Sequence, residues 1–134
     1  MKALVLASYL ATSPAWACDT ALMLTIDVSN SIDVAEYKLQ TDGMANAVLD
    51  AEVMDAMIQG QVAVAVMQWS GVDRQEVSIP WTQITNEADA RAFAADARTM
   101  PRAFVQSDTA PGDAILFALD QFADAPQWDR KVID

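Results

Sequence analysis

One carboxylate and two hydroxyls stand at alternate positions in the five-residue segment Asp27-Val28-Ser29-Asn30-Ser31. Alternate residues of an extended turn can point the same way, so three side-chain oxygens can converge on one point. Such oxygen ligands suit a hard divalent cation, namely Mg²⁺, Ca²⁺ or Mn²⁺. The pattern predicts a metal site formed by Asp27, Ser29 and Ser31. Because these residue types are also common in turns and helix caps, a purely structural role stays open.

The elements on either side of this segment predict an α/β fold. Residues 21–26 form a continuous apolar run that ends at Asp27, as expected for a strand buried on both faces of a parallel sheet. Asp33 and Glu36 then form a capping-box pattern at the start of a helix over about residues 33–48. Ligands of open α/β sheets bind beyond the carboxyl ends of the strands, which is where the Asp27 segment lies.

The rest of the chain continues the alternation of strands and helices. Pro80 lacks a backbone donor, which favours the edge of a sheet for its strand. Near the C-terminus, Ile115, Leu119 and Phe122 recur at helical spacing and are predicted to pack inward. The order predicts a three-layer fold with a mainly parallel sheet and one antiparallel edge strand. We expect a short helix at 52–58, strands at 62–69 and 75–81, helices at 86–98 and 114–123, and a strand that begins at Lys131.

The N-terminus has the pattern of an export signal. A lysine precedes a short apolar stretch, a proline breaks it, and Ala15-Trp16-Ala17 matches a small-x-small cleavage site. We expect removal of residues 1–17, which leaves one domain over 18–134 in the periplasm or outside the cell, with no stable membrane insertion. A buried first element of a protein that is not exported is the alternative. Cys18 would begin the mature chain, but the residues before it fit a lipid-attachment signal poorly.

Composition narrows the class of function. The formal net charge of −11 argues against nucleic acid and anionic membranes as partners, because both require basic surfaces. The chain has no histidine, which excludes a Ser-His-Asp triad and disfavours zinc. It also lacks glycine-rich phosphate-binding and dinucleotide-binding motifs. We therefore expect a binding domain without catalytic residues or an organic cofactor, not an enzyme.

The segment Ile26–Ser31 resembles the metal-ion-dependent adhesion site of von Willebrand factor A-type domains. The segment Asp108–Ile115 is similar to the threonine loop of that family, and the resemblance extends over about residues 19–134. It implies a Rossmann-like fold, Thr109 as a further metal ligand, and a protein partner whose acidic residue completes the coordination of the ion. Two other segments resemble an uncharacterised exported bacterial subgroup of these domains: Trp69-Ser70-Gly71 and Pro80-Trp81-Thr82.

The chain departs from the family pattern at its C-terminal end. The family's final aspartate lies in a loop after the strand that here begins at Lys131, whereas Asp134 falls inside that strand. We therefore expect a C-terminally truncated domain that lacks one loop of the metal site. Two other interpretations stay open: a degenerate or truncated fragment that binds no metal, and a phosphoryl-transfer enzyme with Asp27 as nucleophile. Ser29 counts against the enzyme, because such folds usually have a second acid at that place.

Overall fold

The computed structural model describes residues 17–105 and 108–134. Its four strands form one sheet in the order β3-β2-β1-β4, in which β1 pairs in parallel with β2 and β4, and β3 pairs antiparallel to β2. The predicted mainly parallel sheet with an antiparallel edge strand is confirmed. The proposed export signal lies outside the described residues, apart from Ala17. The strands are β1 (Ala17–Asp27), β2 (Ala63–Trp69), β3 (Gln75–Gln83) and β4 (Gln127–Ile133).

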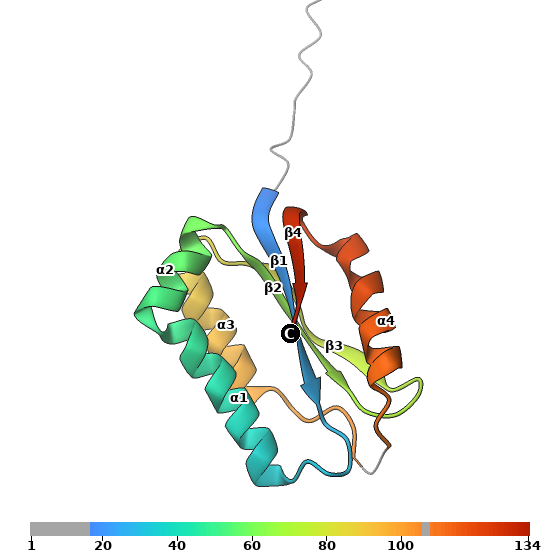
Figure 1. The fold of residues 1–134 in the computed structure, drawn as a ribbon. Coiled ribbons are helices and arrows are strands. Elements are labelled where there is room, and N and C mark those ends of the chain that lie inside the picture. Colours follow the sequence, from blue (N-terminus) through green and yellow to red (C-terminus); the bar gives the residue numbers. More distant parts are fainter. Residues whose placement is uncertain (1–16, 106–107) are drawn as a thin grey trace, which may run out of the picture.

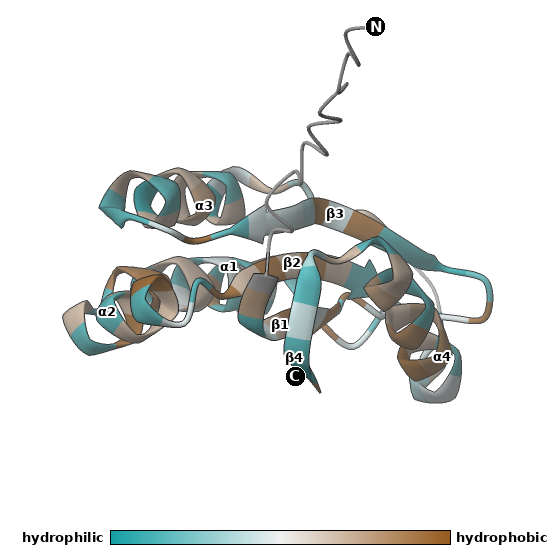
Figure 2. Cartoon of the chain, turned by 90° about the horizontal axis from the view of Figure 1, so that it is seen from above, coloured by the Kyte–Doolittle hydropathy of each residue, from teal (hydrophilic) through white to brown (hydrophobic). Residues whose placement is uncertain are grey.

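Helices cover both faces of this sheet (Figures 1 and 2). One face carries α1 (Val34–Leu49), α2 (Ala51–Gln59) and α3 (Glu87–Thr99). The other face carries α4 (Pro111–Gln121), which continues into a 3₁₀ turn, η1 (Phe122–Asp124). The result is a three-layer α/β architecture that is compatible with the Rossmann-like von Willebrand A fold.

Two hydrophobic clusters attach the helices to the sheet. Residues 63–68 of β2 are all buried, because helices lie on both sides of this strand. The cluster under α1–α3 includes Ile26, Val28, Val48, Val64, Val66 and Phe93. The cluster under α4 includes Ala21, Met23, Ala65, Met67, Ala114, Ala118 and Phe122.

The inward face of α4 differs from the predicted one. Ala114 and Ala118 are buried, whereas Ile115 is 53% exposed and Leu119 is 40% exposed. Phe122 is buried as predicted, although it belongs to η1. The prediction selected the larger apolar residues Ile115 and Leu119, which are four positions apart. The buried face is instead formed by the small residues one position earlier, Ala114 and Ala118. Alanines let the helix backbone lie close to the sheet, and this packing overrides the size of the neighbouring side chains.

β4 begins at Gln127 rather than at Lys131, so the predicted start was too late. The prediction relied on apolar side chains. All residues of β4 are exposed or half-buried, because this strand lies at one end of the described sheet. Its pairing with β1 starts at the Ala17–Gln127 pair. This pairing uses backbone groups, so the polarity of the side chains is a weak predictor of where the strand begins.

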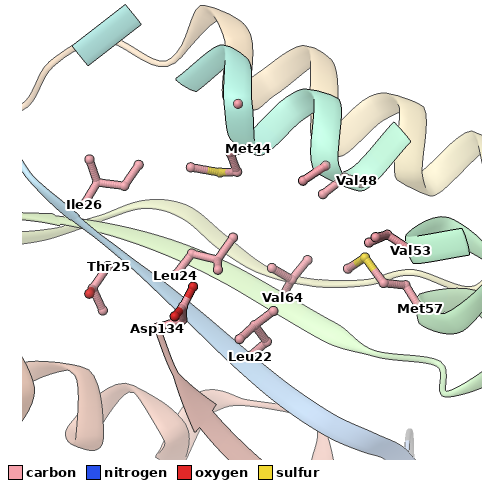
Figure 3. Close-up of a pocket in the computed structure, with 12 residues that line it drawn as sticks. Leu22, Leu24, Thr25, Ile26, Met44, Val48, Val53, Met57, Val64 and Asp134 are labelled. Atoms are coloured by element: carbon pink, nitrogen blue, oxygen red, sulfur yellow. The ribbon is translucent and has the colours of Figure 1, made fainter. Parts of the chain in front are cut away.

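An apolar groove of about 380 Å³ lies between β1 and the helices α1 and α2. Leu22 and Leu24 of β1 face Met44 and Val48 of α1 across this groove (Figure 3). Asp134 contributes a polar group to its lining. The groove lies on the face of the sheet opposite α4, so it is separate from the packing of α4.

Candidate metal site

The Asp27–Ser31 segment follows β1 directly and lies beside the end of β2. Asp27 pairs with Trp69 in the parallel register, and the N–H of Val28 donates to the Trp69 carbonyl at 2.9 Å. Side chains alternate along β1, with Met23 in the cluster under α4 and Ile26 in the cluster under α1–α3. This alternation places Asp27 on the face that α4 covers.

A tight turn places the Asp27 carboxylate beside the backbone of Ser29 and the hydroxyl of Ser29 beside that of Ser31. Asp27 Oδ1 accepts a 2.8 Å hydrogen bond from the N–H of Ser29, and Ser29 Oγ lies 3.5 Å from Ser31 Oγ. The N–H of Ile32 donates to the Ser29 carbonyl at 3.0 Å and closes the turn. Ser29 is fully buried, Asp27 is half-buried and Ser31 is exposed. The turn therefore runs from the interior at Ser29 to the surface at Ser31.

Thr109 lies in the loop before α4, which the structure fixes to the end of β2. The N–H of Ala110 donates to the Ser70 carbonyl at 2.7 Å, and Asp108 packs over Gly71. Because β1 and β2 are neighbours, the segments that follow β1 and precede α4 lie at the same end of the sheet (Figure 1). Thr109 is exposed, and within the described residues no hydrogen bond joins its side chain to Asp27, Ser29 or Ser31.

The carboxylate and hydroxyl oxygens of this turn are of the chemical type that hard divalent ions prefer. Adjacent ligands of octahedral Mg²⁺ at about 2.1 Å lie about 3.0 Å apart. The Ser29 and Ser31 hydroxyls, 3.5 Å apart, lie about 0.5 Å farther apart than that spacing. The part of the chain that the structure describes contains no cluster of three or more His, Cys, Asp or Glu side chains that could hold a metal. An ion bound here would depend on hydroxyl oxygens.

Ser70 adds a buried hydroxyl beside the same loops. Its side chain is fully buried, and its Oγ has no hydrogen-bond partner within the described residues. It follows Trp69 at the end of β2, and its carbonyl receives the N–H of Ala110. Buried polar atoms are normally hydrogen-bonded, so the Ser70 hydroxyl is an exception at the end of β2 that a polar ligand could satisfy.

Arg102 is a residue of this region that the sequence analysis did not single out. Its guanidinium donates to the carbonyls of Val28 at 2.7 Å, Ser29 at 2.9 Å and Ile32 at 2.8 Å. Its Nε donates to the Phe104 carbonyl at 2.9 Å. Hydrogen bonds from a charged donor are stronger than those between neutral groups. Arg102 thus engages three backbone carbonyls of this segment and none of the side-chain oxygens of Asp27, Ser29 and Ser31.

Gln68 holds the segment that carries Arg102. It is fully buried in β2, and its Nε2 donates to the Pro101 carbonyl at 2.9 Å and to Ser78 Oγ at 2.8 Å. Its Oε1 accepts from the N–H of Ala103 at 3.0 Å. A sequence signal for both residues existed: Gln68 is the one amide in an apolar strand, and Arg102 is the one cation in its loop.

Tyr37 of α1 provides a second attachment for the same segment. Its hydroxyl donates to the Met100 carbonyl at 3.0 Å. Burial raises the pKa of the Tyr37 phenol, and the nearby Arg102 charge partly opposes that rise. The phenol therefore stays protonated at neutral pH and remains a donor.

Fold and loops together define an α/β domain with a mainly parallel sheet and a hydroxyl-rich turn beyond its central strands. The chain belongs to the family described as "Protein of unknown function (DUF1194)", whose family model matches residues 17–134. No curated protein matches the chain. Within residues 17–105 and 108–134, none of the helices has the length and apolar character needed to cross a bilayer.

Proposed function

We propose that this chain is a divalent-cation-dependent protein-binding domain of an exported bacterial protein and has no enzymatic activity. The ion, Mg²⁺ or else Ca²⁺ or Mn²⁺, is held by Asp27, Ser29 and Ser31, with Thr109 from the loop before α4. The supporting observation is the pair of serine hydroxyls 3.5 Å apart in the turn that Asp27 closes. The resemblance to metal-ion-dependent adhesion sites supports the same assignment.

The charge of the proposed site explains how it would recognise a partner. Three of its four ligands are neutral hydroxyls, so Asp27 alone compensates part of the charge of the ion. An acidic side chain of a partner protein can then enter an open coordination position. The net charge of −11 favours uptake of a cation but repels an acidic partner at long range. Recognition would therefore depend on short-range attraction to the ion.

An open coordination position can be tested with Mn²⁺ as the probe. Bound Mn²⁺ that retains exchangeable water enhances the relaxation rate of water protons, and added acetate should lower this enhancement by displacing water. The same samples should release no phosphate from p-nitrophenyl phosphate. Protein-bound Mn²⁺ without exchangeable water, or phosphate release that Asp27→Ala abolishes, would contradict a binding function.

The assignment to an exported protein rests on the cleavage pattern that ends at Ala17. Cleavage there would remove only the first residue of β1 and its pairing with Gln127. Mass spectrometry of the chain expressed in a bacterium should find a mature N-terminus at Cys18 in the periplasm or medium. Full-length protein confined to the cytoplasm would contradict this part of the proposal.

A further inference from the structure

We infer that Arg102 is a positioning residue that holds the Asp27–Ser31 turn in its ion-binding conformation, an inference that rests on the proposed function. Arg102 acts through the backbone, because its side chain donates to main-chain carbonyls and to none of the four proposed ligand side chains. It would therefore shape the site without coordinating the ion.

The contacts of Arg102 span the turn. The carbonyl of Val28 precedes the two serines, the carbonyl of Ile32 follows them, and that of Ser29 lies between. One guanidinium joins all three at 2.7, 2.8 and 2.9 Å. Because the donors of guanidinium form a rigid planar fork, these carbonyls cannot move independently while Arg102 is in place. The side chains of Ser29 and Ser31 are carried by this fixed stretch of backbone.

Arg102 is itself held on both sides. Its Nε donates to the Phe104 carbonyl, and the neighbouring residues Pro101 and Ala103 are bonded to the buried Gln68. The turn after β1 is thus connected through Arg102 to the interior of β2. Such supporting interactions around metal ligands commonly change metal affinity by about 10- to 100-fold.

The positive charge of Arg102 allows its positioning effect on the turn to be distinguished from its direct electrostatic effect on the ion. Arg102 is a cation beside a proposed cation site, so its direct Coulomb effect on the ion is repulsive. If repulsion dominated, removal of Arg102 would tighten Mg²⁺ binding. If positioning dominates, removal weakens binding even though a repelling charge has gone.

The test is titration calorimetry of Mg²⁺ into wild type, Arg102→Lys and Arg102→Ala. We expect both variants to raise the dissociation constant by about tenfold or more. Lysine retains the charge but lacks the wide planar fork of donors by which arginine spans the turn. Arg91→Ala is the matched control, because Arg91 is exposed on α3 in an ion pair with Glu87 and its loss changes the net charge equally. An unchanged or lower dissociation constant in Arg102→Ala would overturn the inference.

Hydrogen exchange in metal-free protein tests the positioning role of Arg102 independently of the proposed metal binding. The N–H of Ile32 donates to the Ser29 carbonyl, so its hydrogen exchange reports on the turn. In metal-free protein, exchange should be faster in Arg102→Lys and unchanged in Arg91→Ala. If wild type binds no Mg²⁺ while this difference appears, the proposed function fails and only the holding of the turn stands. Unfolding of both Arg102 variants would overturn the inference, because Arg102 would then be required by the fold.

Discussion

Asp27 has two roles that a single substitution can separate. Its Oδ1 accepts the N–H of Ser29 and closes the turn, and its negative charge is the only one among the four proposed ligands. Asparagine offers a side-chain oxygen for the same hydrogen bond but carries no charge. Asp27→Asn therefore tests ion binding with the turn intact, whereas Asp27→Ala removes both the hydrogen bond and the charge.

The thiol of Cys18 should be unreactive in the folded protein. The side chain is 3% exposed, and burial raises the pKa of the thiol above its usual value of 9.0. The reactive thiolate is scarce at pH 8, so labelling by a thiol-specific disulfide reagent should be at least about tenfold slower in native protein than in urea. Equal labelling rates in both conditions would contradict the burial of Cys18 in β1.

The raised pKa of the Cys18 thiol should also make the protein less stable at alkaline pH. As pH rises through 9.0, the unfolded chain loses the Cys18 proton before the folded chain does. The contribution of this thiol to stability is therefore complete below that pH and declines above it. Cys18→Ala should reduce the loss of stability between pH 8 and pH 10, as followed by urea denaturation.

Residues of the candidate site could be predicted from the sequence only where their partners are local. Asp27, Ser29 and Ser31 fall within one turn, and their spacing was sufficient to single them out. Arg102 and Gln68 were missed because their partners lie far along the chain, at separations of 70 and 33 residues in two of their bonds. The local sequence marks both as unusual residues, an amide in an apolar strand and a lone cation in a loop, but it does not identify their distant partners.

Among the elements, α1 contains a glycine that the fold does not require. A Cβ at Gly43 would meet nothing within 4 Å, and the residue lies inside the helix. Gly43→Ala should raise the free energy of unfolding by about 1 kcal/mol, because alanine restricts the unfolded chain and favours helix. Gly60→Ala is the comparison, since its Cβ would lie 3.3 Å from the Ala56 carbonyl oxygen. Urea denaturation that shows Gly43→Ala to be destabilising would contradict the open space at this position.

The start of α3 should make the fold sensitive to acid. The hydroxyl of Thr85 donates to Asp89 Oδ2 at 2.7 Å, and the backbone N–H of Thr85 and the side chain of Asn86 bond the same oxygen. These bonds lower the pKa of the Asp89 carboxyl from its usual value of 3.8. Its contribution is present above that value and is lost as pH falls below it. Asp89→Ala should lower stability at pH 7 and reduce the further loss from pH 5 to pH 2.5, whereas an unchanged acid dependence would contradict this role.

Strands and helices could be predicted where apolar side chains mark them. The continuous runs of β1 and β2 and the capping box of α1 identified these elements. The start of β4 and the inward face of α4 could not be identified in this way. β4 is held by backbone pairing, and Ala114 and Ala118 pack because they are small. Neither the backbone pairing of β4 nor the alanine face of α4 produces a strong pattern of apolar residues in the sequence.

The whole molecule brings loops from distant parts of the chain to one end of its sheet. β1 and β2 are adjacent, and the loop before α4 is bonded to the end of β2. Arg102 joins that end to the turn after β1. The proposed site therefore depends on the tertiary fold, and a peptide of residues 27–31 alone should not bind the ion.

The most direct measurement is calorimetric titration of Mg²⁺ into the folded wild type and Asp27→Asn. Asp55→Ala is the matched control, because this exposed acid of α2 lies outside the site and its loss changes the net charge equally. Wild type and Asp55→Ala should bind one Mg²⁺ with the same dissociation constant, and Asp27→Asn should give no heat of binding. Equal binding by wild type and Asp27→Asn, or no binding by wild type, would contradict a cation site at this turn.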